Sequence, residues 1–251
     1  MLNMVERGYP RSGIHGRVVH ELGREIVSGV LKQGEKLPNE AEFINRFNGS
    51  RTAIREAFRV LSAKGLLEAR QRAGTRVRVR AYWNLWDPDI LSWHSVSNLD
   101  EQVVRQLFEL RAMVEPEAAR LLAENPSKGV GVSVLEKHCH EMEQAWNEGC
   151  ASKVKEAQIS FHLSLIDNCE NEFLVRTREA VQLILRHCQE MRPVQSIDAL
   201  GTTRWYSLIT EKISKGDASA ATNAIRSLVI SDRERMTQAG KKRLMQKNAV
   251  A

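Results

Sequence analysis

Residues 50–59 read SRTAIREAFR and predict a helix with one apolar face and one cationic face. The apolar positions recur at helical spacing and are Ile54, Ala57, Phe58 and Leu61. The arginines are four residues apart, share the opposite face and are Arg51, Arg55 and Arg59. Ser50 is a favourable N-cap, and Gly65 suits a left-handed stop after the last turn. Such a helix fits a DNA major groove, although a surface helix with solvated arginines gives the same pattern.

Two helices upstream would complete a helix-turn-helix order. An apolar stripe predicts a first helix over residues 16–27, and a turn at 34–38 follows it. A short second helix is predicted after Asn39, which can act as its cap with Glu42 three residues later. The Asn48-Gly49 turn then leads directly into the arginine helix.

A basic hairpin is predicted downstream of these helices. Residues 66–70 and 75–80 read as two strands around a turn at 71–74. In the second strand Val77 and Val79 would share an apolar face, opposite a basic face. That basic face consists of Arg76, Arg78 and Arg80. Three helices followed by such a hairpin predict a winged helix-turn-helix.

The distribution of charge favours DNA binding independently. Residues 1–80 hold 16 Lys and Arg against 8 Asp and Glu, a net charge of +8. The whole chain of 251 residues carries +6, so residues 81–251 carry −2. The basic excess therefore lies in the predicted winged helix, as expected if this part alone meets phosphates.

The motifs of this region resemble those of a known family. They are residues 37–40 (LPNE), 50–57 (SRTAIREA), 64–66 (KGL) and 73–75 (AGT). Together they look like the DNA-binding domain of GntR-family bacterial transcription regulators, and the later part of the chain is similar to the FadR subfamily. The resemblance covers residues from about 15 to 235. It implies a mainly α fold, in which the winged helix is followed by an all-helical, FCD-type effector domain.

The resemblance also implies a set of DNA-binding residues. Arg51, Thr52 and Arg55 would contact the operator, and residues 72–74 would form the tip of the wing. The complete predicted set is Asn39, Glu40, Ser50, Arg51, Thr52, Ala53, Arg55, Arg72, Gly74 and Arg76. In many relatives the position after Glu40 is an arginine that touches DNA, whereas this chain has Ala41. That contact is therefore absent or is supplied from elsewhere.

The rest of the chain predicts a packed connector and a helical bundle. The domains are expected at residues 12–80, 81–98 and 99–245. The connector holds three Trp and a Tyr within twelve residues, which favours aromatic docking of the winged helix onto the bundle. Similar connectors occur in sugar-acid-responsive relatives, such as repressors of galactonate operons. Helical periodicity after residue 99 predicts an antiparallel bundle of six or seven helices, with a kink or restart at Pro116. One of these helices is predicted over residues 171–191, and Asp217 is a natural cap for the last one.

The bundle departs from its relatives at the metal site. Many of them hold a divalent metal through an Asp, a His four residues later and two further His. Alignment places Gln158, His162, Tyr206 and Leu228 at these four positions. A lone His cannot hold a zinc-type ion, so we expect no metal and no other cofactor.

A polar set remains in the predicted pocket. Gln158, His162 and Tyr206 carry hydrogen-bond donors suited to a hydroxylated or carboxylated effector. Arg111 matches an arginine near the pocket in the family and can pair with a carboxylate. The alternative is that these four residues are core polar groups that bond one another.

Taken together, the sequence predicts a cytoplasmic, homodimeric transcription regulator, more readily a repressor than an activator. A small organic or sugar acid would release it from a palindromic operator. A fatty-acyl effector is one alternative, and a non-specific architectural DNA-binding protein is another. No membrane partner is expected, because the chain has no apolar run long enough to span a bilayer. No enzyme activity is expected either. The sequence has no Gly-rich phosphate-binding loop, no paired inward carboxylates and no Cys/His or Ser/His/Asp arrangement.

Overall fold

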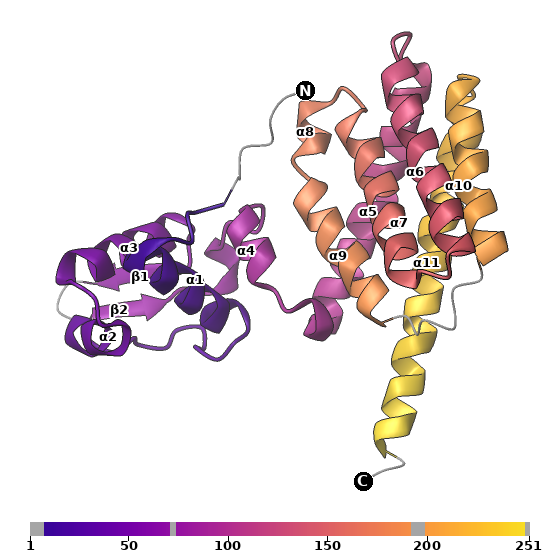
Figure 1. Ribbon diagram of the computed structural model, residues 1–251. Coiled ribbons are helices and arrows are strands. Elements are labelled where there is room, and N and C mark those ends of the chain that lie inside the picture. The colour runs from indigo at the N-terminus through magenta and orange to yellow at the C-terminus, as the bar shows by residue number, and fades with distance from the viewer. Residues whose placement is uncertain (1–7, 71–73, 192–198, 249–251) are drawn as a thin grey trace. The chain divides into compact units, whose positions relative to one another are not determined.

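The computed structural model describes residues 8–70, 74–191 and 199–248, and the chain divides into two compact units (Figure 1). The first unit is Met1–Ser95 and the second is Val96–Ala251. Within these ranges, side chains are described through residue 237, apart from those of residues 98 and 199–203. Each unit has its own apolar core, so each is described by itself.

The first unit is a winged helix-turn-helix, as the sequence predicted. Its elements, in chain order, are α1 (Gly13–Val27), α2 (Glu40–Phe47), α3 (Arg51–Ala63), β1 (Leu67–Arg70), β2 (Gly74–Val77), the 3-10 helix η1 (Arg80–Tyr82) and α4 (Pro88–Trp93). The core is built from the predicted apolar stripes, with Leu22 of α1 and Ile54 of α3 fully buried. Helix α3 packs on α1, which leaves its arginine face exposed.

The wing is shorter than its sequence pattern predicted. Strands β1 and β2 pair antiparallel from Leu67 opposite Val77 to Arg70 opposite Gly74. The Arg78 N–H still donates to the Leu66 carbonyl at 2.9 Å, in register with this pairing, and the chain then leaves the hairpin for η1 at Arg80. Val79 is therefore 48% exposed, and its predicted place on the apolar face was wrong.

Two of the four connector aromatics pack into the first unit, whereas Tyr82 and Trp86 are 61% and 52% exposed. Trp83 and Trp93 are buried in its core, and the Trp93 indole N–H donates to Nδ1 of His20 at 2.9 Å. Gly23 makes room for Trp93, because a Cβ at that position would lie 2.5 Å from the indole ring. Packing of the connector is thus confirmed for Trp83 and Trp93 only. Its docking onto the bundle and the predicted domain ranges stay predictions.

The second unit is a helical bundle. Its elements are the 3-10 helix η2 (Val96–Asn98), α5 (Glu101–Glu124), α6 (Gly129–Asn147), α7 (Ala151–Asp167), α8 (Glu172–Val175), α9 (Arg178–Met191), α10 (Ala199–Ser214) and α11 (Ala218–Asn248). The long helices run alongside one another, with α5 packed on α11 and α6 packed on α7 (Figure 1). Asp217 caps α11 as predicted, accepting from the Ala220 N–H at 3.0 Å. Within the described ranges, no helix is both long and apolar enough to cross a membrane.

Two helix boundaries differ from the expected ones. Helix α5 continues through Pro116 without a restart, because burial of this face against the core stabilises the helix at a residue that lacks an N–H. The helix predicted over 171–191 is divided into α8 and α9. The Thr177 hydroxyl donates to the Leu174 carbonyl at 2.7 Å at this break. Such a local bond competes with the helical hydrogen-bond pattern.

Candidate nucleic-acid interface and buried polar cluster

The turn between α2 and α3 fixes the start of the predicted recognition helix. Asn39 and Glu42 form a reciprocal capping box on α2, with both backbone-to-side-chain distances at 3.1 Å. Asn48 adopts the left-handed conformation at φ 48°, which ends α2 and redirects the chain. The Ser50 hydroxyl then caps α3 by accepting from the Ala53 N–H at 3.2 Å. Asn39 and Ser50 thus have structural roles as well as their predicted DNA-binding roles.

The exposed face of α3 begins with Arg51 and Thr52. Both side chains are exposed at the first turn, beside half-buried Ala53. Among the described residues, Arg51 has no acidic partner within ion-pair distance. Its charge is therefore available to a polyanion such as DNA.

Arg55 is held differently, by the predicted site residue Glu40. The Nε atom of Arg55 donates to both carboxylate oxygens of Glu40, at 3.0 and 3.1 Å. This geometry engages Nε and leaves the two terminal nitrogens of the guanidinium for a second partner. Glu40 is thus placed to orient Arg55. It is not suited to contact a phosphate itself, because its carboxylate and the phosphate are both negative.

The wing holds the remaining predicted DNA-binding residues. Gly74 has a positive φ of 83° at the start of β2, a conformation that favours glycine. Arg76 is half-buried, and its guanidinium donates to the Gly34 carbonyl at 3.0 Å. This bond holds Arg76 at the base of the wing. Arg72 lies outside the described residues.

The two units differ in their net formal charge. Residues 1–95 hold 16 basic and 10 acidic side chains, whereas residues 96–251 hold 21 of each. The whole net charge of +6 therefore belongs to the winged-helix unit. This distribution matches a protein that meets nucleic acid with one unit only.

A buried cluster of charged side chains lies in the second unit. Arg111 of α5 is fully buried and lies between two carboxylates. Its Nε donates to Glu115 at 2.5 Å, and its terminal nitrogens lie 3.3 Å from Oδ2 of Asp232 on α11. Burial alone would raise the pKa of Glu115, but the charges of Arg111 and His162 lower it to about 2. Burial would likewise lower the pKa of Arg111, but the two carboxylates outweigh it and raise that pKa.

Two of the predicted effector residues, His162 and Tyr206, connect to this cluster. The Nδ1–H of His162 donates to Glu115 at 2.7 Å, because an ionised carboxylate can only accept. Nε2 of His162 lies 3.2 Å from the Tyr206 hydroxyl, while Gln158 accepts from Gln189 at 2.9 Å. The structure thus brings His162 and Tyr206 together and links both to Arg111 through Glu115. These bonds match the alternative of core polar groups that satisfy one another.

Two cluster members, Glu115 and Asp232, were absent from the sequence prediction. Glu115 follows Arg111 by four residues on one helix, a spacing that typically forms ion pairs and would have revealed it. Asp232 lies 121 residues away, and no local spacing indicates its contact with Arg111.

The donor chemistry of this cluster does not fit a bound metal. The guanidinium of Arg111 already lies against both carboxylates and would repel a divalent cation. Leu228, at one of the four positions that hold metal in relatives, is an apolar member of the core. Across the described ranges, no group of three or more His, Cys, Asp or Glu is arranged to hold a metal ion.

One Ser–His–Glu set appears that residue spacing did not reveal. His138 of α6 lies 3.1 Å from the Ser164 hydroxyl of α7 and 2.8 Å from Glu141. Ser164 is 8% exposed and lies within α7, where helical hydrogen bonds engage the neighbouring backbone N–H groups. No backbone donor is thus placed at Ser164 to stabilise an oxyanion, and the set joins α6 to α7.

Comparison with known families assigns both units. Residues 14–77 match the family described as bacterial regulatory proteins, gntR family. Residues 106–230 match the FCD domain. The two matched ranges fall within the winged-helix unit and the helical bundle respectively.

Individual relatives extend this similarity over nearly the whole chain. The chain is 30% identical to the galactonate operon transcriptional repressor of Escherichia coli K12, over 88% of this chain and 96% of that protein. It is 31% identical to the Glc operon transcriptional activator of the same strain, over 65% of this chain and 64% of that protein. Among solved structures, it is similar in fold to the Listeria monocytogenes protein Lar, with a TM-score of 0.60 and 21% identity. That match covers 93% of this chain and 99% of Lar.

Proposed function

Because the chain belongs to the GntR family of transcription regulators and carries an FCD domain, we propose that it represses a sugar-acid operon. It is a regulator and not an enzyme, as its relatives are. In this proposal a cytoplasmic homodimer binds a palindromic operator through two winged helices. A small organic acid, most simply an aldonate, enters each bundle and releases the DNA.

The observation that carries the DNA-binding part is the exposed start of α3. Arg51 and Thr52 lie at the first turn of a helix whose other face is buried against α1. The N-terminal end of a recognition helix is the part that reaches base edges in the major groove. Arg55 is available at the same end with two terminal nitrogens. Two-fold dimers match palindromic half-sites, which supports the homodimer.

The buried cluster supports an acidic effector. Arg111 is the one fully buried arginine or lysine among the described residues, and it already lies between two carboxylates. A ligand carboxylate reaching Arg111 would exchange with Glu115 or Asp232, which would alter the contact between α5 and α11. His162, Tyr206 and Gln158 would then bond the hydroxyl groups of the ligand.

The test uses full-length protein and a duplex from the region upstream of its own gene. Fluorescence anisotropy should show tighter binding to this duplex than to a scrambled one, and the ratio should fall in Arg51→Ala. Removing an arginine that reads a base typically costs about 1–3 kcal/mol of specific binding. Equal affinity for both duplexes would instead indicate an architectural DNA-binding protein.

The effector is tested on the same complex. Galactonate and other aldonates should weaken DNA binding, and Tyr206→Phe should reduce this response while leaving DNA affinity unchanged. Tyr206→Phe is chosen because it removes one hydroxyl and keeps the ring, whose centroid lies 4.8 Å from that of Phe161. Release by acyl-CoA and not by aldonates would favour a fatty-acyl effector.

A further inference from the structure

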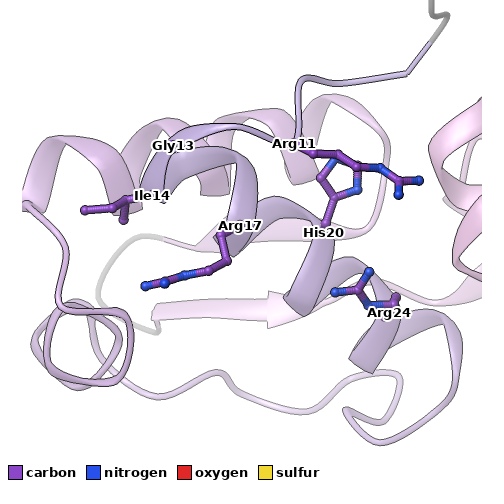
Figure 2. A pocket seen from close by; sticks show the side chains of 6 residues that line it. All are labelled: Arg11, Gly13, Ile14, Arg17, His20 and Arg24. Carbon is purple, nitrogen blue, oxygen red and sulfur yellow. The ribbon is translucent and has the colours of Figure 1, made fainter.

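An open pocket with a volume of about 470 Å³ lies along α1, outside the predicted DNA-binding set. Its lining consists of Arg11, Gly13, Ile14, Arg17, His20 and Arg24 (Figure 2). Half of these residues are arginines. Figure 2 shows Arg11 and Arg24 on one side of the helix with His20 between them, while Arg17 extends the other way.

The positive charge of this pocket is not balanced within the described part of the chain. Arg11 and Arg24 are exposed, and neither forms an ion pair with a described carboxylate. Arg17 donates to the Phe47 carbonyl at 2.6 Å, which leaves its charge uncompensated. The contrast is Arg46 of α2, which pairs with Glu25 on another side of α1.

The pocket continues the surface that begins at the recognition helix. A Cβ on Gly49 would lie 2.8 Å from Cγ2 of Ile14, so the start of α1 touches the turn between α2 and α3. The Phe47 carbonyl that Arg17 holds belongs to the last turn of α2, three residues before Ser50 caps α3. Ile14 and Arg17 therefore lie at the turn that leads into α3.

The base of the pocket is fixed by hydrogen bonds. The Trp93 indole can only donate, so Nδ1 of His20 must accept the hydrogen bond. Nε2 of His20 then carries the hydrogen and donates to the Tyr9 carbonyl at 2.9 Å. This bond ties the segment that carries Arg11 to α1, which holds Arg11 near Arg24.

We propose that this pocket binds backbone phosphates of the operator DNA that flanks the base pairs read by α3. The inference rests on the proposed DNA-binding function and adds a second contact region to it. Arginine is suited to phosphate because its planar guanidinium can donate two parallel hydrogen bonds. Contacts of this kind add affinity without reading sequence, and each releases condensed counterions from the DNA.

The test measures the salt dependence of DNA binding by full-length protein. Arg11→Ala and Arg24→Ala are the informative variants, because neither side chain has a partner among the described residues. Arg17→Ala is left aside, since removing its bond to Phe47 can disturb the fold. The control is Arg186→Ala, which removes the same charge from an exposed position on α9 in the other unit.

Each pocket variant should bind upstream and scrambled duplexes about fivefold more weakly at about 0.15 M salt. The slope of log affinity against log salt should fall in magnitude by about 0.9 for each arginine that is removed. Arg186→Ala should keep the wild-type slope. Pocket variants with the same slope and affinity as Arg186→Ala would overturn the proposal.

A shortened duplex tests where the contact lies. Removing flanking base pairs outside the half-sites should weaken the wild type to the level of the Arg11→Ala/Arg24→Ala double variant and leave that variant unaffected. Equal weakening of both proteins would place the contact elsewhere and overturn the proposal. A pocket for free phosphate alone would also overturn the proposal. In that case inorganic phosphate at constant ionic strength would raise the melting temperature of the wild type but not of the double variant, and both proteins would bind DNA with the same affinity. Failure of the proposed function gives a different result. The wild type would then bind the upstream and scrambled duplexes equally, and Arg51→Ala would bind both as tightly as the wild type.

Discussion

At the scale of single residues, Arg111 has the most constrained environment in the bundle. A guanidinium without exposed surface is tolerated only because two carboxylates and their hydrogen bonds replace its hydration. The same helix carries an exposed pair at the same spacing, Arg105 with Glu109 at 3.0 Å. The two pairs differ in burial, and burial decides what breaking each of them costs.

Arg111→Ala should therefore destabilise the second unit by about 3–5 kcal/mol, because it leaves Glu115 and Asp232 buried without a counter-charge. Arg105→Ala removes an exposed i,i+4 pair and should cost less than about 0.5 kcal/mol. Urea unfolding followed by circular dichroism compares the two variants with the wild type. Similar destabilisation in both would show that the burial of Arg111 has no energetic consequence.

At the scale of elements, the start of α3 combines two roles in one residue. Ser50 caps the helix through its hydroxyl and belongs to the predicted DNA-binding set. An aspartate caps a helix as well as serine does, but it brings a negative charge towards DNA phosphates. Substitutions at this position can therefore separate folding from binding.

Ser50→Ala should lower stability by about 1 kcal/mol, since the Ala53 N–H loses its acceptor. Ser50→Asp should keep the wild-type melting temperature and still bind the upstream duplex much more weakly. Thermal unfolding and anisotropy on the same preparations measure both effects. If Ser50→Asp binds DNA as tightly as the wild type, the start of α3 does not face the phosphates.

The packing of α1 against α4 depends on a missing side chain. Gly23→Ala places a methyl group 2.5 Å from the Trp93 ring, so α4 must shift or Trp93 must leave the core. Overpacking of this kind costs about 1–3 kcal/mol. Gly129→Ala, where no atom lies within 4 Å of the new Cβ, should be near neutral. Tryptophan fluorescence during unfolding would detect the change, and equal melting temperatures would contradict the packing described.

At the scale of the whole molecule, the two units differ in net charge and in where their charged groups lie. The winged-helix unit carries the net positive charge, while the bundle is neutral overall and buries ionised groups in its core. The first arrangement makes DNA binding sensitive to salt, and the second makes bundle stability sensitive to acid. The two units should therefore respond to different solution conditions.

The unfolding free energy of the bundle should fall as the pH drops from about 4.5 towards about 2. The pKa of Glu115 is about 2 in the folded protein and near 4.5 when unfolded, so its stabilising contribution is complete above 4.5 and lost in between. Glu115→Gln should be less stable at neutral pH but should show a flatter pH dependence in this window. Chemical denaturation at several pH values measures the difference, and parallel curves for both proteins would contradict the assignment.

The spacing of residues along the chain was sufficient to predict most helices, the hairpin and the helix caps. Helices α1, α2 and α3, the hairpin and the all-helical second unit follow from periodicity over a few residues. The capping residues Asn39, Ser50 and Asp217 follow from local cap chemistry. The exposure of Arg51 and Thr52 follows in the same way, because burying one helix face determines the other.

Contacts between distant parts of the chain required the three-dimensional structure. Val79 is exposed because the chain leaves the hairpin for η1 directly after it, and α5 runs through Pro116 because the core around it stabilises the helix. The predicted effector residues form hydrogen bonds within the protein because Glu115 and Asp232 meet Arg111 from two helices. Spacing fixes which residues share one helix face, whereas burial and the partners of a charge depend on which faces pack together. That is settled only when the whole core minimises its exposed apolar surface and leaves no buried charge unpaired.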